Sequence, residues 1–259
     1  MSETVLFEMD GSVGIVTLNR PERHNAIDDA TGDQLRRLFD AAIGDDGVRA
    51  ILIRGAGKSF CSGRDTAVLG HRARDESDYH FIRRHQQFRL RILDCPKPIV
   101  AAVKGAAIGG GCEMALACDI RVAGSDLKLG LPEINYGLLP DTGGTQYLAN
   151  LVGPSRAKYM IMSGTRIDAP TALAWGAVDF VVAPHEVDAK ALEIATTLAG
   201  KPPIALAMAK TMIDQGLAGA VRNGIAQELL AQTALFKTQD YAEARAAIRE
   251  GRQPVYTGK

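Results

Sequence analysis

The feature that most constrains the fold is a change of pattern near residue 143. Before it, short apolar runs alternate with helical periodicity and glycine-rich loops, which is typical of an α/β protein whose strands are joined by helical crossovers. After it, helical periodicity dominates and only residues 179–182 are strand-like. The sequence therefore predicts an α/β core followed by a mainly helical region.

The expected elements follow from apolar periodicity and from the residues that break it. Strands are expected at residues 5–9, 13–18, 50–54, 99–103, 120–123 and 179–182. Helices are expected at residues 28–44, 77–93, 112–117, 145–152, 155–163, 169–175, 186–199, 204–215, 218–236 and 241–250. We expect residues 1–200 to form the core and residues 201–259 to form a helical oligomerisation region, because the tail offers more apolar stripe than one small sheet can cover.

The bulk composition excludes several classes of partner. The chain has 259 residues, of which 46% are hydrophobic and 23% are charged, so one large domain can bury a sizeable core. The formal net charge of zero gives no support for a nucleic-acid partner. No run approaches the roughly 18 apolar residues that cross a bilayer, and residues 1–7 lack the basic start of a signal peptide, so no membrane partner is expected.

The four cysteines have neither the spacing of a metal site nor that of a redox pair. Free thiols are typical of a reducing compartment, so we expect a cytoplasmic protein without a metal centre.

Three familiar motifs are excluded because the sequence lacks glycines that they require. Residues 57–59 invite a P-loop interpretation, but that motif needs glycine where Leu52 stands. A dinucleotide fingerprint needs a third glycine where Met114 stands, and Ser62 lacks the flanking glycines of a nucleophile elbow. The glycine-rich segments therefore need another explanation.

Two small-residue loops, at residues 59–65 and 105–111, each follow an expected strand. Glycine lets the backbone approach a ligand closely, and the second loop runs into a helix whose first N–H groups are unpaired. One N–H donor from each loop would make an oxyanion hole. The alternative is that both stretches are only tight turns in a twisted sheet.

Two glutamates lie near these loops in the expected fold. Glu113 falls in the first helical turn after the glycines, where the helix dipole stabilises an anion. Glu133 lies in an apolar stretch beside Pro132, where a carboxylate is costly unless it is paired or functional. A salt bridge at the end of a loop is the structural alternative for Glu133. Two carboxylates near one carbonyl would suit acid–base chemistry on a carbon acid.

Matches in the same order span nearly the whole chain and identify a resemblance. They cover residues 16–21, 25–26, 60–65, 98–103, 105, 109–113, 118–121, 132–133, 137–140, 143–146 and 164–167. The most distinctive are Ser62-Gly63-Arg64-Asp65 and Gly109-Gly110-Gly111-Cys112-Glu113. In these segments the sequence resembles the crotonase family, the enoyl-CoA hydratases and isomerases.

The resemblance implies a crotonase-like spiral of ββα units with a C-terminal helical region. It implies a homotrimer or a dimer of trimers, and an acyl-CoA thioester as the substrate. No cofactor is implied, because coenzyme A is part of the substrate.

The resemblance also implies the roles of particular residues. The thioester oxygen would lie between the backbone N–H groups of Arg64 and Gly110. Glu113 and Glu133 would hold water and exchange a proton with the α-carbon. The positions expected beside the adenine end of CoA are Ser62, Asp65 and Thr66.

Two positions depart from the family pattern. Arg64 replaces a usual alanine, and its side chain is expected either to contact a CoA phosphate or an acidic group on the substrate, or to point to solvent or pair with Asp65. Asp141 stands where many hydratases have glycine and some isomerases have a catalytic aspartate. It could instead cap the turn at residues 142–144.

The leading functional prediction is a hydro-lyase that adds water syn across a trans-2-enoyl-CoA. Glu133 would exchange the α-proton and Glu113 would orient and deprotonate water. The alternatives are an enoyl- or dienoyl-CoA isomerase that uses Asp141 as its base, and a catalytically silent acyl-CoA-binding protein.

Overall fold

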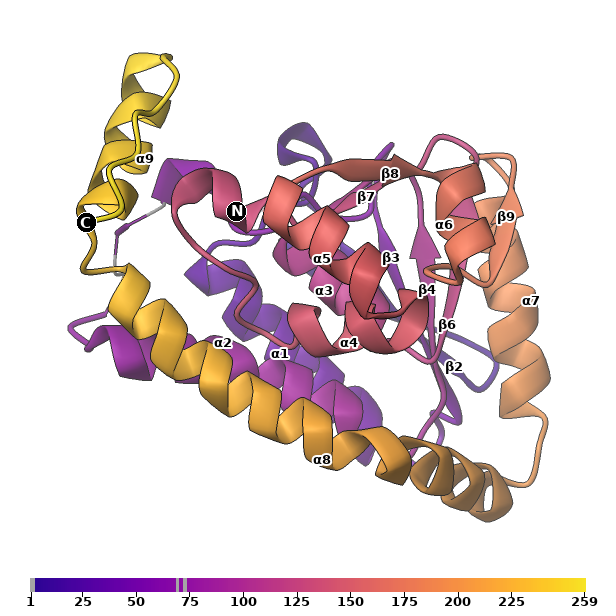
Figure 1. Cartoon of the computed structure of the whole chain (residues 1–259). Helices are drawn as coiled ribbons and strands as arrows, with labels where there is room; N and C mark the ends of the chain where they lie inside the picture. The colour runs from indigo at the N-terminus through magenta and orange to yellow at the C-terminus, as the bar shows by residue number, and fades with distance from the viewer. Residues whose placement is uncertain (1–2, 69, 72–73) are drawn as a thin grey trace.

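A six-stranded, mostly parallel sheet forms the centre of the computed structural model, which describes residues 3–68, 70–71 and 74–259 (Figure 1). The strand order is β1-β2-β3-β4-β6-β9, with an antiparallel β1–β2 hairpin and parallel pairing from β2 onward. The strands are β1 (Val5–Asp10), β2 (Val13–Leu18), β3 (Ala50–Gly55), β4 (Ile99–Val103), β6 (Ile120–Gly124) and β9 (Phe180–Val182). β2 and β4 are buried along their whole length, as expected of strands covered on both faces.

A second, three-stranded sheet was not predicted from the sequence. It consists of β5 (Ala106–Ile108), β7 (Lys128–Gly130) and β8 (Arg166–Asp168), in the order β5-β7-β8. These strands have only three residues each, which is too short for alternation to show in the sequence. A bridge between Cys61 and Ala107 joins the loop after β3 to β5, so the two glycine-rich loops lie side by side.

Helices cover both faces of the main sheet. α7 (Val187–Ala199) packs over β3, β4 and β6 on one face. The helices of the core before α7 are α1 (Asp29–Gly44), α2 (Asp78–Leu93), α3 (Gly110–Ala117), α4 (Gly144–Val152), α5 (Pro154–Ser163) and α6 (Ala169–Trp175). Short 3₁₀ helices span Pro21–Arg23, Thr66–Val68 and Glu133–Tyr136. The predicted α/β core followed by a helical region is confirmed.

The C-terminal region corrects one prediction. Residues 204–215 and 218–236 were expected to be separate helices, but α8 (Pro203–Leu235) is a single helix of 33 residues, followed by α9 (Gln239–Glu250). Gly216 and Gly219 lie within α8, where glycine costs only roughly 0.5–1 kcal/mol relative to alanine. α8 runs along α2 and also contacts α4 (Figure 1). The division at residue 200 and the oligomerisation role stay predictions.

Within the described ranges, none of the helices combines the length and the apolar character needed to cross a membrane.

Candidate active site

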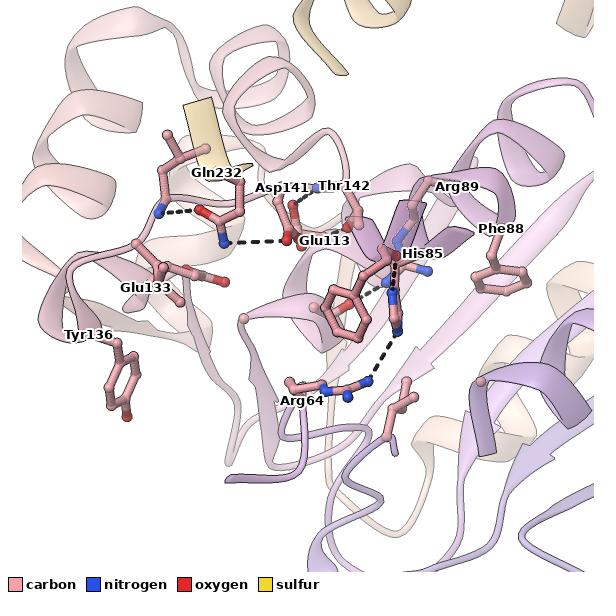
Figure 2. Close-up of a pocket in the computed structure, with 18 of the residues that line it drawn as sticks. Arg64, His85, Phe88, Arg89, Glu113, Glu133, Tyr136, Asp141, Thr142 and Gln232 are labelled. Carbon is pink, nitrogen blue, oxygen red and sulfur yellow. Dashed lines mark hydrogen bonds between the residues drawn. The ribbon is translucent and has the colours of Figure 1, made fainter. Parts of the chain in front are cut away.

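A cavity of about 220 Å³ lies where the two glycine-rich loops meet α2 and the C-terminal helices. Its lining comes from α1, the loop after β3, α2, the start of α3, residues 132–142, the end of α8 and the start of α9. Figure 2 shows carboxylates, among them Glu133 and Asp141, on one side of the cavity and Arg64 with His85 on the other.

The two loops touch through glycines in the left-handed region. Gly63 has φ 87°, and a Cβ there would lie 2.6 Å from the carbonyl oxygen of Ile108 and 3.1 Å from the nitrogen of Gly110. Only glycine permits this approach. Among the described residues, the amides of Arg64 and Gly110 donate to no protein group, so both are available to a ligand. The oxyanion hole made by these amides stays a prediction.

Glu113 is held in one orientation by the start of α4. Its Oε1 accepts from the amides of Thr142 and Gly144, both at 2.9 Å, and its Oε2 accepts from Thr142 Oγ1 at 2.6 Å. A Cβ at position 144 would lie 2.8 Å from Glu113 Oε1, so this support requires glycine. The carboxylate is therefore both buried and fully oriented.

Glu133 begins the 3₁₀ helix Glu133–Tyr136 and has no such support. Its Oε2 is buried without a hydrogen-bond partner, and no ion pair of Glu133 is present in the described part of the chain. The salt-bridge alternative is therefore wrong. Burial, followed by the negative charge of Glu113, raises the pKa of Glu133 well above its ordinary value. Glu133 thus faces the cavity as a carboxyl group whose protonated form is favoured by its surroundings.

Asp141 lies in the same cavity. Its Oδ2 accepts from Gln232 Nε2 at 3.3 Å, and its main-chain carbonyl accepts from Gln86 Nε2 at 2.8 Å. Burial and the charge of Glu113 raise the pKa of Asp141 to about 7. Because its carboxylate accepts from Gln232 rather than from the amides of residues 142–144, Asp141 does not cap that turn.

The Arg64 side chain was expected, in one alternative, to point to solvent or to pair with Asp65. That alternative is wrong, because the side chain pairs with Asp29. Its Nη1 donates to Asp29 Oδ1 at 2.6 Å and lies 3.0 Å from His85 Nε2. The guanidinium also lies over the ring of Phe81, at 5.0 Å from the centroid.

The three residues expected beside CoA fall in two environments. Ser62 and Thr66 line the cavity, and their contact with CoA stays a prediction. Asp65 is buried, accepts from Arg20 Nη2 and from the amide of Ala67, each at 3.0 Å, and therefore fixes the loop from inside.

Two charged residues of the site were missed in the sequence. Arg89 of α2 is 5% exposed and donates to the carbonyl of Gly110 at 2.5 Å. Glu228 of α8 accepts from the amide of Gly143 at 2.7 Å and from Thr145 Oγ1 at 2.6 Å, and burial with the charge of Glu113 raises its pKa to about 8. Both lie on the apolar stripe of a helix, and a charged residue on such a stripe is the pattern that could have revealed them.

The α/β core with its two sheets, the touching glycine loops and the buried carboxylates are the features of a crotonase-type enzyme. The chain belongs to the family described as enoyl-CoA hydratase/isomerase, whose model matches residues 8–259.

Similar proteins cover the whole length of the chain. It is 37% identical to the short-chain-enoyl-CoA hydratase of Clostridium acetobutylicum, over 96% of this chain and 95% of that one. It is 36% identical to the 2,3-dehydroadipyl-CoA hydratase of Escherichia coli, over all of both chains. The solved structure of a carnitinyl-CoA hydratase from Mycobacterium avium superposes with a TM-score of 0.89 at 30% identity, over all of both chains. The predicted fold class and family are confirmed.

Proposed function

We propose that this protein is an enoyl-CoA hydratase, a hydro-lyase that adds water across the double bond of a trans-2-enoyl-CoA. The observation that carries the proposal is the difference between two carboxyl groups in one cavity. Glu113 is an oriented acceptor held by three donors, whereas the raised pKa of Glu133 favours its protonated form. The hydratase names of the similar proteins support the same reaction.

In the proposed reaction, the thioester carbonyl accepts hydrogen bonds from the amides of Arg64 and Gly110. These fixed dipoles stabilise the enolate that forms when water adds to C3. Glu113 takes the proton that the water loses, and Glu133 gives its proton to C2. Both groups act from one side of the substrate, so addition is syn. Glu113 then returns its proton to solvent and Glu133 is protonated again. No cofactor beyond the CoA of the substrate takes part.

Asp141 is proposed as an auxiliary catalytic carboxyl beside this pair. The isomerase alternative gave it the role of base, but the similar proteins reported above are named hydratases. A purified Asp141→Asn variant that hydrates crotonyl-CoA more slowly than the wild type, but still turns it over, would support the auxiliary role.

The proposal extends to assembly and location. Exposed apolar side chains on the first half of α8 support a homotrimer or a dimer of trimers. The four cysteines are free, which supports a cytoplasmic location.

The decisive experiment follows the loss of enoyl-thioester absorbance with crotonyl-CoA. We expect turnover by the wild-type protein and a loss of about 10²–10⁴-fold in kcat for Glu133→Gln, because the general acid is removed. Glu193→Gln, which changes an exposed glutamate on α7, is the matched control and should keep full activity. Binding of crotonyl-CoA without turnover by the wild type would support the silent-binder alternative and refute the proposal.

A further inference from the structure

The guanidinium of Arg64 is held rigidly at the wall of the cavity that faces the carboxylates (Figure 2). Asp29 anchors its Nη1, the ring of Phe81 supports its flat face, and His85 Nε2 lies 3.0 Å from the same Nη1. Three neighbours from two helices therefore fix the position and the rotation of one side chain.

His85 orients this guanidinium without neutralising it. Burial, with the positive charge of Arg64, lowers the pKa of His85, so the ring is neutral. Its Nδ1 lies 2.7 Å from the carbonyl oxygen of Phe81 and so carries the proton. The lone pair of Nε2 then accepts a hydrogen bond from Arg64. Because the ring is neutral, His85 does not offset the charge of the guanidinium.

Arg64 has donors left over. An arginine carries five N–H groups, and in the described part of the chain only Nη1 of Arg64 has hydrogen-bond partners. The side chain is 24% exposed and lines the cavity. Its Nε and Nη2 groups are therefore open to an acceptor on a bound molecule.

Arg64 shares its anion with a second arginine. Asp29 is shared, because Arg84 Nη2 also lies 3.5 Å from it. Among the described residues, the surrounding ion-pair network joins Arg36, Arg64, Arg74 and Arg84 to Asp29, Asp33 and Glu76. Asp29 is thus divided between two guanidinium groups, so the charge of Arg64 is only partly offset by Asp29 and can attract a negative group on a ligand.

The position of Arg64 also limits how far that group lies from the thioester. With bond lengths of about 1.5 Å, the guanidinium lies on the order of 5–7 Å from the amide of the same residue. That amide is the proposed donor to the thioester oxygen. The apolar side chains of Ile27, Leu35 and Phe88 line the same cavity and suit methylene groups.

We propose that Arg64 is a specificity-determining residue whose guanidinium binds a terminal carboxylate on an acyl chain of about six carbons. The substrate class is thus a short trans-2-enoyl-CoA that ends in a carboxylate. This inference rests on the proposed function. The expected acyl length holds only if the thioester oxygen lies at the Arg64 amide.

The test compares two substrates of equal length, trans-2-hexenoyl-CoA and its counterpart with a carboxylate at C6. We expect the wild-type kcat/KM to favour the carboxylate substrate by about 10-fold or more, since a charge-assisted bidentate pair is among the strong hydrogen bonds. In Arg64→Gln, the ratio of the two kcat/KM values should fall by about 10- to 100-fold. Arg64→Lys should keep part of the preference, because it keeps the charge and loses the planar fork.

Two further variants sharpen the result. Arg222→Gln removes a positive charge from the exposed side of α8 and should leave the ratio unchanged. Asp29→Asn removes the anion that shares Arg64 and should raise the ratio. The Asp29→Asn result also decides the matter if Arg64→Gln does not fold.

Binding separates a failure of this inference from a failure of the hydratase proposal. Affinities of hexanoyl-CoA and of its C6-carboxylate counterpart, measured by calorimetry, need no turnover. A wild-type protein without preference in either assay, and a ratio that Arg64→Gln leaves unchanged, would overturn the inference even if both enoyl substrates are hydrated. Preference in binding without hydration of either enoyl substrate would uphold the carboxylate site and overturn the hydratase function.

Discussion

Glu113 is the charge around which the other acids of the site are arranged. Its negative charge is the second cause, after burial, of the raised pKa values of Glu133, Asp141 and Glu228. Carboxyl groups that share a buried site cannot all ionise at neutral pH, so some carboxyl groups beside the proposed reaction centre stay protonated.

The raised pKa of Asp141 makes the free energy of unfolding depend on pH. The pKa of Asp141 is raised from its ordinary 3.8 to about 7, so the folded protein binds more protons than the unfolded chain between those values. The free energy of unfolding should therefore decrease as pH rises through this window. Asp141→Asn should raise the free energy of unfolding at pH 8 by on the order of 1–3 kcal/mol relative to the wild type, and should make its slope between pH 4 and 7 less negative. Urea denaturation at pH 4, 5, 7 and 8 measures both; an unchanged slope would contradict the assigned shift.

Arg89 offers a second test at the residue scale. It is a buried cation that holds the carbonyl of Gly110 and offsets the charge of Glu113. Arg89→Met should lower kcat by about 10²-fold with a smaller effect on KM, because the amides of the α3 start lose their fixed orientation. Arg89→Lys should recover part of kcat. An equal loss in both variants, with unchanged pH dependence of kcat, would point to a purely structural role.

At the scale of elements, side chains of α8 bind the loop at residues 139–145, which supports Glu113. Glu228 accepts a hydrogen bond from the amide of Gly143. Gln232 accepts a hydrogen bond from the amide of Leu139 at 3.2 Å and donates one to Asp141. Glu228→Gln should lower kcat by about 10-fold, since an oriented acceptor is lost from a buried network. Hydrogen exchange at residues 141–145 should rise in the same variant. Exchange that stays at the wild-type level would show that the loop does not depend on α8.

The continuity of α8 can be tested at its glycines. A Cβ at Gly216 would meet nothing within 4 Å, so Gly216→Ala should raise the free energy of unfolding by about 0.5–1 kcal/mol. A Cβ at Gly224 would lie 2.0 Å from Gln146 Cδ, so Gly224→Ala should lower it by roughly 1–3 kcal/mol. Destabilisation by Gly216→Ala would instead favour two helices with a break at that position.

The sequence predicted those elements that carry a long periodic pattern. The strands at residues 13–18 and 99–103 match the structure, and Gly44 ends α1 as expected. The strands of the second sheet could not be predicted, because three residues show no period. Gly216 and Gly219 suggest a break between two helices, but α8 continues through both.

The candidate site was predictable where the reason was local. Glu113 follows from the helix start and Glu133 from its apolar neighbours. The partner of Arg64 could not be predicted, because Asp29 lies 35 positions away and only the pairing of Ile27 with Arg64 brings the two together. Arg89 and Glu228 could not be predicted as site residues, because their partners Gly110 and Gly143 lie 21 and 85 positions away in the sequence.

At the scale of the whole molecule, α8 leaves an apolar face uncovered. Ile204, Met208 and Met212 recur every four residues and are 76%, 54% and 67% exposed. Such a face is typical of a subunit interface. The wild type should have a mass near three or six times 27.6 kDa by light scattering. The double variant Met208→Glu and Met212→Glu should give a smaller species, because charges are unfavourable in an apolar interface. A monomeric wild type would refute the proposed assembly.

The late position of α8 and α9 in the chain has a consequence for biosynthesis. Gln232, Phe236 and Tyr241 line the cavity, yet a ribosome makes them after every strand of both sheets. A nascent chain can therefore form its sheets while one wall of the cavity is still untranslated. A chain truncated before Gln232 would keep every strand of both sheets and lack this wall of the cavity.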